Sequence, residues 1–236
     1  MPNIRNASIK RRRCWTYFCM PKHHTWIVKI GGSLIGSPDL EQWLNAIGNV
    51  RRTHRVVVVP GGGVFADTVR TAQTALRLDD GVAHQMALQA MRLFGTALAA
   101  LSRAVGAFEL AQLTEIEAAG PRNGVWIWDP CDPRLRASGL PHNWRISADS
   151  LSLWLAGEFD DAHLLLVKSA APAQRSADLS GLVAEGFVDA YFPVLHARIE
   201  RPAWWLERTQ YHALLALLDG TPMRHNVIGG DSCRHG

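Results

Sequence analysis

The feature that most constrains the fold is a pair of glycine clusters, each of which follows a short apolar run. GGS at 31–33 comes after WIVKI, and GGG at 61–63 comes after RVVVVP. An apolar run of this length, rich in β-branched residues and closed by glycine, predicts a strand buried on both faces, as in a parallel sheet covered by helices. The sequence therefore predicts an α/β protein.

Strands and helices are expected to alternate along the chain. Strands are predicted at 26–30, 55–60, 108–113, 125–128, 163–169, 203–206 and 224–228, and helices at 38–50, 64–76, 82–105, 147–156 and 207–218. Residues 178–198 are expected to combine turns with a helix. This order predicts an open three-layer αβα sandwich with a mainly parallel central sheet.

Charge and hydropathy argue against nucleic-acid and membrane partners. The formal net charge is +4, but four basic residues lie together at 10–13, so the rest of the chain is nearly neutral. No stretch approaches the roughly 18 uncharged apolar residues of a membrane-spanning helix, and the start of the chain lacks the apolar segment of a secretory signal. We expect a cytoplasmic protein.

The chain is expected to form one domain with a basic extension. Residues 1–19 precede a second methionine, Met20, and are either a basic arm or the product of an upstream start codon. Residues 20–236 are expected to form the domain. Its division into lobes of about 25–140 and 141–236 is suggested by the stretch ASGLPHN, which is rich in turn-forming residues.

Cysteine and histidine spacing gives no motif for a bound metal. The cysteines are Cys14, Cys19, Cys131 and Cys233. They show no paired CxxC spacing, so neither a zinc site nor a disulfide scaffold is expected. His23 and His24 lie near the chain start and are expected to be solvated. Cys131 could act as a nucleophile, but no histidine lies near it in the sequence.

Both glycine clusters are expected at carboxyl ends of strands, where open parallel sheets bind ligands. Glycine leaves backbone N–H groups unshielded, and such amides next to a helix N-terminus suit phosphate or carboxylate groups. Lys29, just before the first cluster, adds a cation. Two clusters predict two anionic groups bound side by side, as in the transfer of a phosphoryl group from a donor to an acceptor.

Two other nucleotide-binding motifs fit less well. A P-loop requires GxxxxGK[ST], which the sequence lacks. A dinucleotide-dependent oxidoreductase is allowed by GGGVFA, which satisfies GxGxxA, but no acidic residue ends the next predicted strand. Asp79 and Asp80 lie between predicted helices instead.

Three longer segments, VKIGGSL, VVVVPGGGVFADTVR and ISADSLSLWLA, resemble in this order the amino acid kinase superfamily over about residues 25–230. Within it, PGGGVFADTVR together with HNWRISADSLSL at 142–153 is most similar to the branch of methanofuran biosynthesis, which converts an aminomethylfuranylmethyl phosphate to its diphosphate. The resemblance implies an open αβα sandwich, a homodimer and direct transfer from ATP with Mg²⁺.

The resemblance also implies roles for individual residues. Lys29 would bridge the ATP phosphates and the transferred group, and Asp149 would orient that lysine. The residues implied to contact phosphate are Gly31, Gly32 and Ser33 on the ATP side and Gly61, Gly62 and Gly63 on the acceptor side. The alternatives are a strand-end Lys29 that reaches water and an Asp149 that only stabilises a helix N-terminus.

Recognition of the acceptor is less specified by the sequence. Arg70 could pair with an acceptor phosphate, or it could lie on a solvated helix face. Asp67, three residues earlier on the same helix face, could bind an aminomethyl cation, and Asp79 and Asp80 are further candidates.

One segment departs from the superfamily pattern. Where members carry TDVDG followed by Ile or Val and Tyr, this chain reads LLLVKSAAPAQ, with Lys168 and Ser169 at the Thr-Asp positions. Lys168 is then either a replacement cation for the transition state or a sign that the nucleotide pocket has degenerated. The second interpretation predicts a catalytically inactive protein that binds anions or nucleotides.

Overall fold

The computed structural model describes residues 24–173 and 178–229, so the extension 1–19 and Met20 lie outside the described residues. The described strands are β1 (Thr25–Ile30), β2 (Arg55–Pro60), β3 (Glu109–Ala111), β4 (Gly124–Trp128), β5 (Ala162–Lys168) and β6 (Ala203–Glu207). They form one six-stranded sheet in the order β3-β4-β2-β1-β5-β6, and every neighbouring pair is parallel.

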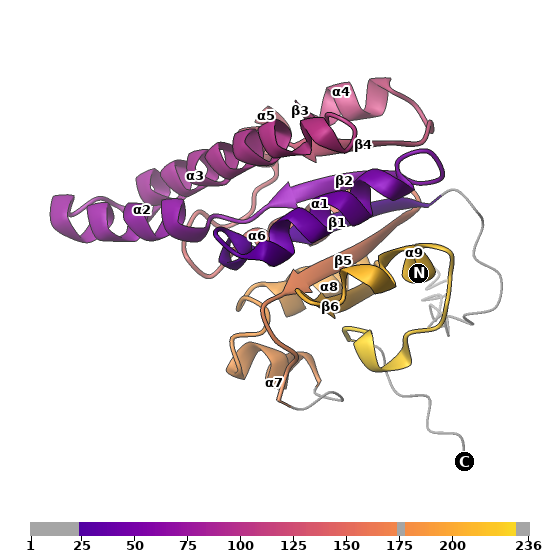
Figure 1. The fold of residues 1–236 in the computed structure, drawn as a ribbon. Helices are drawn as coiled ribbons and strands as arrows, with labels where there is room; N and C mark the ends of the chain where they lie inside the picture. Colours follow the sequence, from indigo (N-terminus) through magenta and orange to yellow (C-terminus); the bar gives the residue numbers. More distant parts are fainter. Residues whose placement is uncertain (1–23, 174–177, 230–236) are drawn as a thin grey trace, which may run out of the picture.

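Helices cover both faces of this sheet (Figure 1). They are α1 (Pro38–Val50), α2 (Gly63–Leu76), α3 (Asp80–Leu101), α4 (Leu113–Ala118), α5 (Pro133–Ala137), α6 (Ala148–Gly157), α7 (Leu179–Ala184), α8 (Phe192–Ile199) and α9 (Leu214–Leu218). The 3₁₀ turns are η1 (Gly32–Leu34), η2 (Ser102–Ala104), η3 (Tyr211–Ala213) and η4 (Arg224–Asn226). The predicted αβα sandwich is confirmed.

Alternation along the strands produces two separate cores. Ile27 and Leu166 lie in the core that α6 and α8 complete, whereas Val28 and Leu165 lie in the core that α1 and α9 complete. Successive side chains of a strand point to opposite faces, so a strand buried on both sides is apolar throughout. Helix α6 is itself buried along almost its full length, which explains why its sequence lacks a polar face.

The connections place a crevice between β1 and β5. Helix α1, which follows β1, packs on one face of the sheet, and α7 and α8, which follow β5 in turn, pack on the other. Where connections leave neighbouring parallel strands on opposite faces, a crevice opens at their carboxyl ends and ligands bind there. Both halves of the chain contribute, because β1 comes from the 25–140 segment and β5 from the 141–236 segment.

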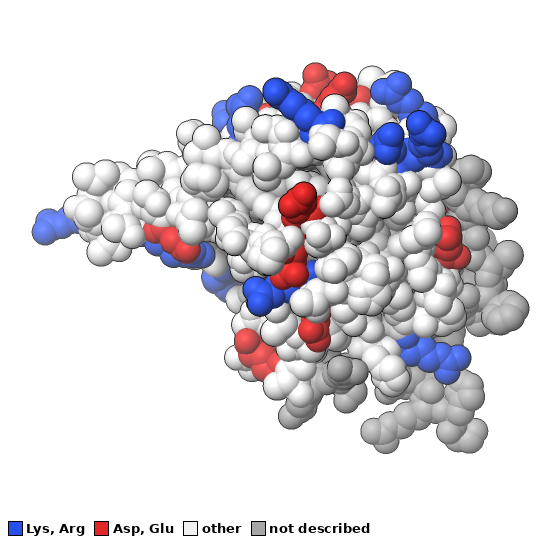
Figure 2. Space-filling model, in the orientation of Figure 1, with Lys and Arg blue, Asp and Glu red and all other residues white. Residues whose placement is uncertain are grey.

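Helices α2 and α3 form an arm that projects beyond the carboxyl ends of the strands (Figure 1). Small side chains such as Ala66 and Ala83 form a minor core between them. Figure 2 shows that this face of the arm is mainly uncharged. At 22 residues α3 is a long helix, yet no helix in the described part of the chain is both long and apolar enough to cross a membrane.

Two predictions near the end of the chain are wrong. The strand predicted at 224–228 is the turn η4 followed by a single antiparallel bridge from Val227 to Trp204. The Asn226 side chain donates to the Trp205 carbonyl at 2.9 Å, so a side chain supplies a bond that a strand would make with its backbone. The helix predicted from 207 starts later, because the Glu207 N–H donates to the Gln210 side chain and closes a turn.

Two short helices were not predicted, although each carries a local start signal. Helix α4 begins where the Gln112 N–H donates to the Glu115 carboxylate at 2.7 Å, which is one half of a capping box. Helix α5 begins with Asp132 as N-cap and Pro133 as its first residue. Both are only about one turn and a half long, too short for a periodic apolar pattern to indicate a helix.

Candidate active site

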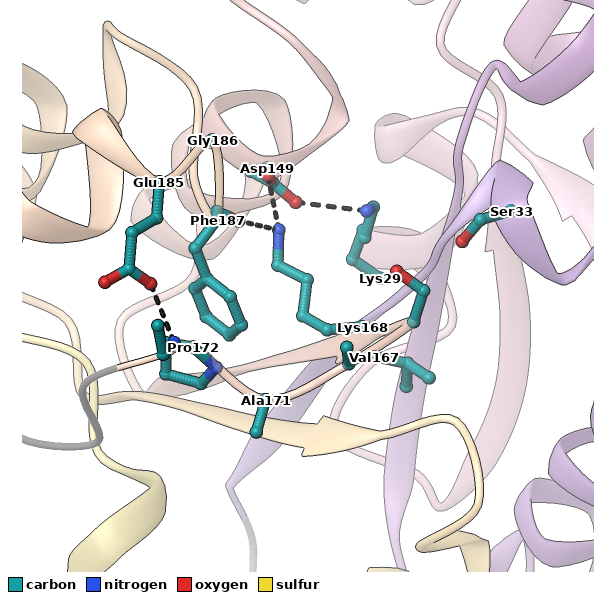
Figure 3. A pocket seen from close by; sticks show the side chains of 13 residues that line it. Lys29, Ser33, Asp149, Val167, Lys168, Ala171, Pro172, Glu185, Gly186 and Phe187 are labelled. Atoms are coloured by element: carbon teal, nitrogen blue, oxygen red, sulfur yellow. Dashed lines mark hydrogen bonds and ion pairs between the residues drawn. The ribbon is translucent and has the colours of Figure 1, made fainter.

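Two lysines from neighbouring strands meet one carboxylate at the crevice (Figure 3). Lys29 of β1 and Lys168 of β5 both lie on the α6 face of the sheet, as their spacing from Ile27 and Leu166 requires. Lys29 Nζ lies 3.1 Å from Oδ1 of Asp149, and Lys168 Nζ lies 2.7 Å from Oδ2. Lys168 also donates to the Phe187 carbonyl oxygen.

The first turn of α6 positions Asp149. Ser147 is the N-cap, and its hydroxyl accepts the Asp149 N–H at 3.3 Å. Because the helix N-terminus has a partial positive charge, an acidic side chain is favoured there. The sequence also allowed an Asp149 that only stabilises the helix N-terminus. In the structure its carboxylate contacts both ammonium groups as well.

Asp189, which the sequence analysis did not single out, holds this helix start in place. Its carboxylate accepts hydrogen bonds from the N–H and hydroxyl of Ser147, the N–H and hydroxyl of Ser150, and the N–H groups of Tyr191 and Phe192. One side chain therefore joins the N-termini of α6 and α8. An aspartate shortly before the FP pair that opens α8 is an N-terminal signal, but nothing local indicates its bonds to α6.

The lysine–aspartate cluster carries an excess of positive charge. Burial alone would raise the pKa of Asp149, but the ammonium groups of Lys29 and Lys168 outweigh it and the pKa lies below its ordinary value. Burial lowers the pKa of Lys168 and Lys29 lowers it further, against the opposing attraction of Asp149. Two cations share one anion, so a bound phosphate would relieve the remaining repulsion.

Residue choice at the site differs from that of the rest of the chain. Lys29 and Lys168 are the only lysines in the described ranges 24–173 and 178–229, where every other permanently basic side chain is arginine. An ammonium is a compact point charge, whereas a guanidinium is a planar fork that needs more room. The crevice thus uses the smaller cation at both positions.

A cavity of about 620 Å³ opens beside the cluster. Its walls are Lys29, Ser33, Asp149, Val167–Ala173 and Glu185–Phe187. The loop after β5 forms one side and is tied to the other side where the Ala173 N–H donates to Glu185 at 2.9 Å. The cavity therefore lies on the α7 side of the crevice, and the two lysines form its inner end (Figure 3).

The two glycine clusters touch each other. A Cβ on Gly32 would lie 2.1 Å from the Gly63 nitrogen, and a Cβ on Gly61 would lie 2.5 Å from the Gly32 nitrogen. Gly63 also has a left-handed backbone with φ +50°. At Gly32 and Gly61 the absence of a side chain is therefore required by the contact between loops, in addition to any role toward a ligand.

The first cluster lies closer to the cavity than the second. A Cβ on Gly31 would lie 3.5 Å from Lys29 Nζ, and Ser33 lines the cavity wall. The second cluster, Gly61–Gly63, does not line the cavity. It leads into α2, the first helix of the arm. Of the predicted ATP-side residues, Ser33 lines the cavity and Gly31 lies beside Lys29, whereas Gly32 contacts Gly63 of the acceptor-side cluster.

The predicted acceptor residues Asp67 and Arg70 pair with each other on the arm. Arg70 Nη1 lies 2.7 Å from Asp67 Oδ1, both side chains are more than half exposed, and the guanidinium lies 4.4 Å from the Trp144 ring centre. In this conformation Arg70 therefore lies on a solvated helix face, which was one of its two expected positions. Neither Asp67 nor Arg70 lines the cavity. The alternative candidates Asp79 and Asp80 cap and begin α3 at the tip of the arm.

The segment before α6 connects the arm to the site. Trp144 donates its ring N–H to Gln73 of α2 at 2.5 Å, and His142 stacks on His84 of α3 with ring centres 4.9 Å apart. His142 and Trp144 of the motif therefore contact the arm, while the ISADS residues form the helix start that carries Asp149. This arrangement explains why both parts occur within one continuous motif.

Cys131 is less isolated than its sequence suggests. It lines a small cavity of about 50 Å³ together with His84 and His142, so two histidines lie near it in space. Burial raises the pKa of the Cys131 thiol, and Asp129 raises it further. A raised pKa keeps the sulfur protonated, and the thiol is a weak nucleophile.

Comparisons with known proteins agree with this geometry. The sequence profile of the amino acid kinase family matches residues 24–123. The chain is 26% identical over 215 residues, which are 85% of this chain and 94% of its relative, to [5-(aminomethyl)furan-3-yl]methyl phosphate kinase of Methanocaldococcus jannaschii.

Two solved structures have the same fold. Uridylate kinase from Archaeoglobus fulgidus superposes with a TM-score of 0.62 at 15% identity, covering 86% of this chain and 97% of that one. Isopentenyl phosphate kinase superposes with a TM-score of 0.56 at 16% identity, covering 87% of this chain and 100% of that one.

Proposed function

Because the chain belongs to the amino acid kinase family, we propose that it transfers the γ-phosphoryl group of ATP to a phosphate group on a small molecule. The observation that carries this proposal is the convergence of Lys29 and Lys168 on Asp149 at the inner end of the cavity. Two fixed ammonium groups, held by one buried carboxylate, are suited to the charge that moves between donor and acceptor oxygens.

In the proposed reaction an oxygen of the acceptor phosphate attacks the γ-phosphorus of ATP. The bond from that phosphorus to the β,γ-bridging oxygen breaks, and ADP leaves with the electron pair. A phosphate oxygen is already ionised at neutral pH, so no residue has to remove a proton. The site then needs positioning and charge stabilisation, which Lys29, Lys168 and the backbone N–H groups near Gly31 can supply.

ATP would occupy the cavity, with its phosphates toward the lysines and Ser33. Asp149 and Glu185 are the described carboxylates that line this cavity. Asp149 is paired with two ammonium groups and Glu185 accepts a backbone N–H, so the described residues build no dedicated cage of carboxylates. This fits Mg²⁺ that arrives on the ATP phosphates with its own water ligands.

For the acceptor we propose (aminomethylfuranyl)methyl phosphate, which would become its diphosphate in the biosynthesis of a methanofuran-type one-carbon carrier. The similarity to the kinase of Methanocaldococcus jannaschii over 94% of that protein supports this choice. The acceptor would lie across η1 from ATP, between Gly61–Gly63 and the arm. In the conformation described, Asp67 and Arg70 would have to turn from each other to reach it.

The acceptor is tested by measuring ADP release with a panel of phosphates. Purified protein with Mg²⁺ and ATP is given (aminomethyl)furanylmethyl phosphate, UMP, isopentenyl phosphate or no acceptor. We expect ADP release to depend on the furan phosphate, with kcat/KM at least about 100-fold above the other two, the scale of discrimination that specific polar contacts give. ADP release with UMP or isopentenyl phosphate, but not with the furan phosphate, would reject the proposed acceptor. Tight ATP binding without ADP release from any mixture would favour an inactive binding protein.

A further inference from the structure

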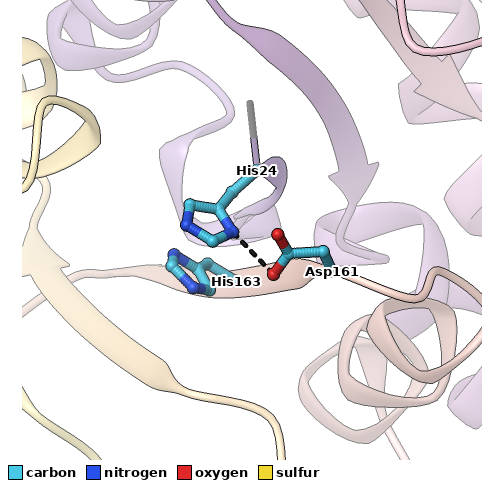
Figure 4. Close-up of side chains that lie close together, drawn as sticks. All are labelled: His24, Asp161 and His163. Carbon is cyan, nitrogen blue, oxygen red and sulfur yellow. Dashed lines mark ion pairs between the residues drawn. The ribbon is translucent and has the colours of Figure 1, made fainter. Parts of the chain in front are cut away.

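Three metal-binding side chains meet at the opposite edge of the sheet, where β1 and β5 begin (Figure 4). His24 immediately precedes β1, and Asp161 and His163 flank the first residue of β5. The strands are in register from Thr25 with Ala162, and the Thr25 N–H donates to the Asp161 carbonyl at 3.0 Å. The backbone therefore fixes all three residues at one place, away from the lysine cluster.

The prediction that His24 is solvated is wrong. Its side chain is 9% exposed and its ring stacks on His163 with centres 4.0 Å apart. His163 is 4% exposed and packs edge-on against Trp26 at 4.9 Å. A buried imidazole normally places both ring nitrogens against partners, since each is a strong donor or acceptor.

These two rings leave three nitrogens without a hydrogen-bond partner among the described residues. They are Nδ1 and Nε2 of His24 and Nδ1 of His163. His24 Nδ1 lies 2.6 Å from Oδ1 of Asp161, but the approach lacks the alignment of a hydrogen bond. Ring nitrogens that are buried, close to a carboxylate and without a hydrogen-bond partner indicate a missing ligand rather than a complete hydrogen-bond network.

We propose that His24, Asp161 and His163 bind a divalent transition metal of the zinc class. Two imidazole nitrogens and one carboxylate oxygen match the preference of Zn²⁺ for tetrahedral nitrogen and oxygen ligands. Mg²⁺ and Ca²⁺ prefer oxygen ligands throughout, so the metal that accompanies ATP does not fit this site. Asp161 is 60% exposed, which leaves a path for the ion and a position for water.

Binding requires a small closure of the site. The candidate ligand atoms lie within 4.8 Å of one another, whereas ligands about 2.1 Å from a tetrahedral ion are about 3.4 Å apart. The His24 ring must also turn out of its stack, because the nitrogen lone pairs of two stacked rings run nearly parallel. His24 lies before the first strand residue, so this turn breaks no sheet hydrogen bond.

The test is a titration of the full chain with Co²⁺, which replaces Zn²⁺ and absorbs visible light when tetrahedral. The protein is stripped with EDTA and passed through a desalting column before the titration. We expect saturation at one Co²⁺ per chain with intense visible bands, and a higher Tm in the presence of Zn²⁺ because the ion binds only the folded state.

Two variants assign the ligands. Asp161→Asn changes an exposed side chain and should weaken Co²⁺ binding by about 10-fold or more. His163→Phe keeps an aromatic ring beside Trp26 and Trp204, which both contact the His163 ring, and should abolish binding. The matched control is Asp219→Asn, because His54 and Asp219 form a pair of similar exposure, 3.3 Å apart, for which the described part of the chain offers no third ligand. Binding should be unchanged in this variant.

Three results would overturn the proposal. The first is no saturable binding of Co²⁺. The second is binding that persists unchanged in both Asp161→Asn and His163→Phe. The third is a strong thiolate-to-cobalt charge-transfer band, which would assign the ion to cysteines elsewhere in the chain.

Discussion

Lys168 donates from the end of β5 to Asp149 at the start of α6, with 2.7 Å between Nζ and Oδ2. The carboxylate stands between this ammonium and that of Lys29, so the cations are held near each other without direct contact. The departure from the superfamily pattern at 168 therefore places a cation in the cavity wall. This position favours the interpretation of Lys168 as a replacement cation over a degenerated pocket.

Lys168 should tolerate neither loss of its charge nor exchange for arginine. Lys168→Met is expected to lower kcat by about 10²- to 10³-fold, the scale of losing one fixed group that stabilises the transition state. Lys168→Arg keeps the charge, but a planar guanidinium does not fit between Asp149 and the Phe187 carbonyl, so its kcat should stay at least about 10-fold low. Steady-state kinetics checks both, with Arg208→Met, an exposed cation paired with Asp39, as control. A fully active Lys168→Arg enzyme would contradict this role.

Asp189 should act as a positioning residue through the start of α6. Asp189→Asn removes the carboxylate that accepts hydrogen bonds from Ser147 and Ser150. It is expected to lower kcat about 10- to 100-fold, the range for residues that orient the side chains contacting the reacting groups. The KM for ATP should change little, because Asp189 does not line the cavity. Asp178→Asn is the matched control, since Asp178 caps α7 in the same way without contacting α6. Equal kinetic effects of the two variants would reject the positioning role.

The acid stability of the protein should report the ionisation of Asp149. The pKa of Asp149 is below the ordinary 3.8 in the folded protein. Its stabilising contribution is therefore complete above the unfolded pKa and is lost as pH falls through the folded pKa. Urea unfolding should show wild type more stable than Asp149→Asn by a constant margin from pH 7 to about pH 5, and that margin should shrink below about pH 4. A margin that grows on acidification would contradict the ion cluster.

Gly32→Ala should damage the site because its Cβ would meet backbone rather than a movable side chain. The Cβ would lie 2.1 Å from the Gly63 nitrogen and 2.3 Å from its Cα, so the two loops must separate, at a cost of about 3 kcal/mol in the free energy of unfolding. The KM for ATP should rise as well. Gly36→Ala is the control: its φ of +80° strains alanine by about 1–2 kcal/mol, but nothing lies within 4 Å of its Cβ. If Gly36→Ala raised the KM equally, loop contact would not be the cause.

Much of the fold follows from local sequence signals. The boundaries of α1 are as predicted, because Ser37 and Pro38 define its start and its apolar residues recur at helical spacing. The runs at 55–60 and 162–168 are apolar enough to be buried on both faces, and the structure places them in the sheet. The strand predicted at 224–228 is wrong because only two of its residues are apolar. The polar Asn226 bonds the neighbouring strand through its side chain, so the segment needs no strand backbone.

The candidate site was only partly accessible from sequence. Lys29 and Asp149 lie in segments that resemble the superfamily, so both could be named, and the structure brings them within 3.1 Å. Asp189 acts across about 40 residues of sequence through hydrogen bonds, and no local pattern encodes a contact of that separation. Asp67 and Arg70 were both expected to contact the acceptor, and their pairing with each other was not predicted. Their i,i+3 spacing on a helix favours such a pair.

The proposed transfer of a phosphoryl group from ATP to an acceptor phosphate depends on the two lysines that Asp149 holds. It is tested most directly by phosphorus NMR of the protein with Mg²⁺, ATP and (aminomethylfuranyl)methyl phosphate, with Lys29→Ala in parallel. We predict new coupled doublets of a diphosphate ester besides those of ADP in the wild-type sample, and none from the variant after the same time. Loss of ATP signal without a diphosphate ester, or an equal yield from Lys29→Ala, would contradict the claim.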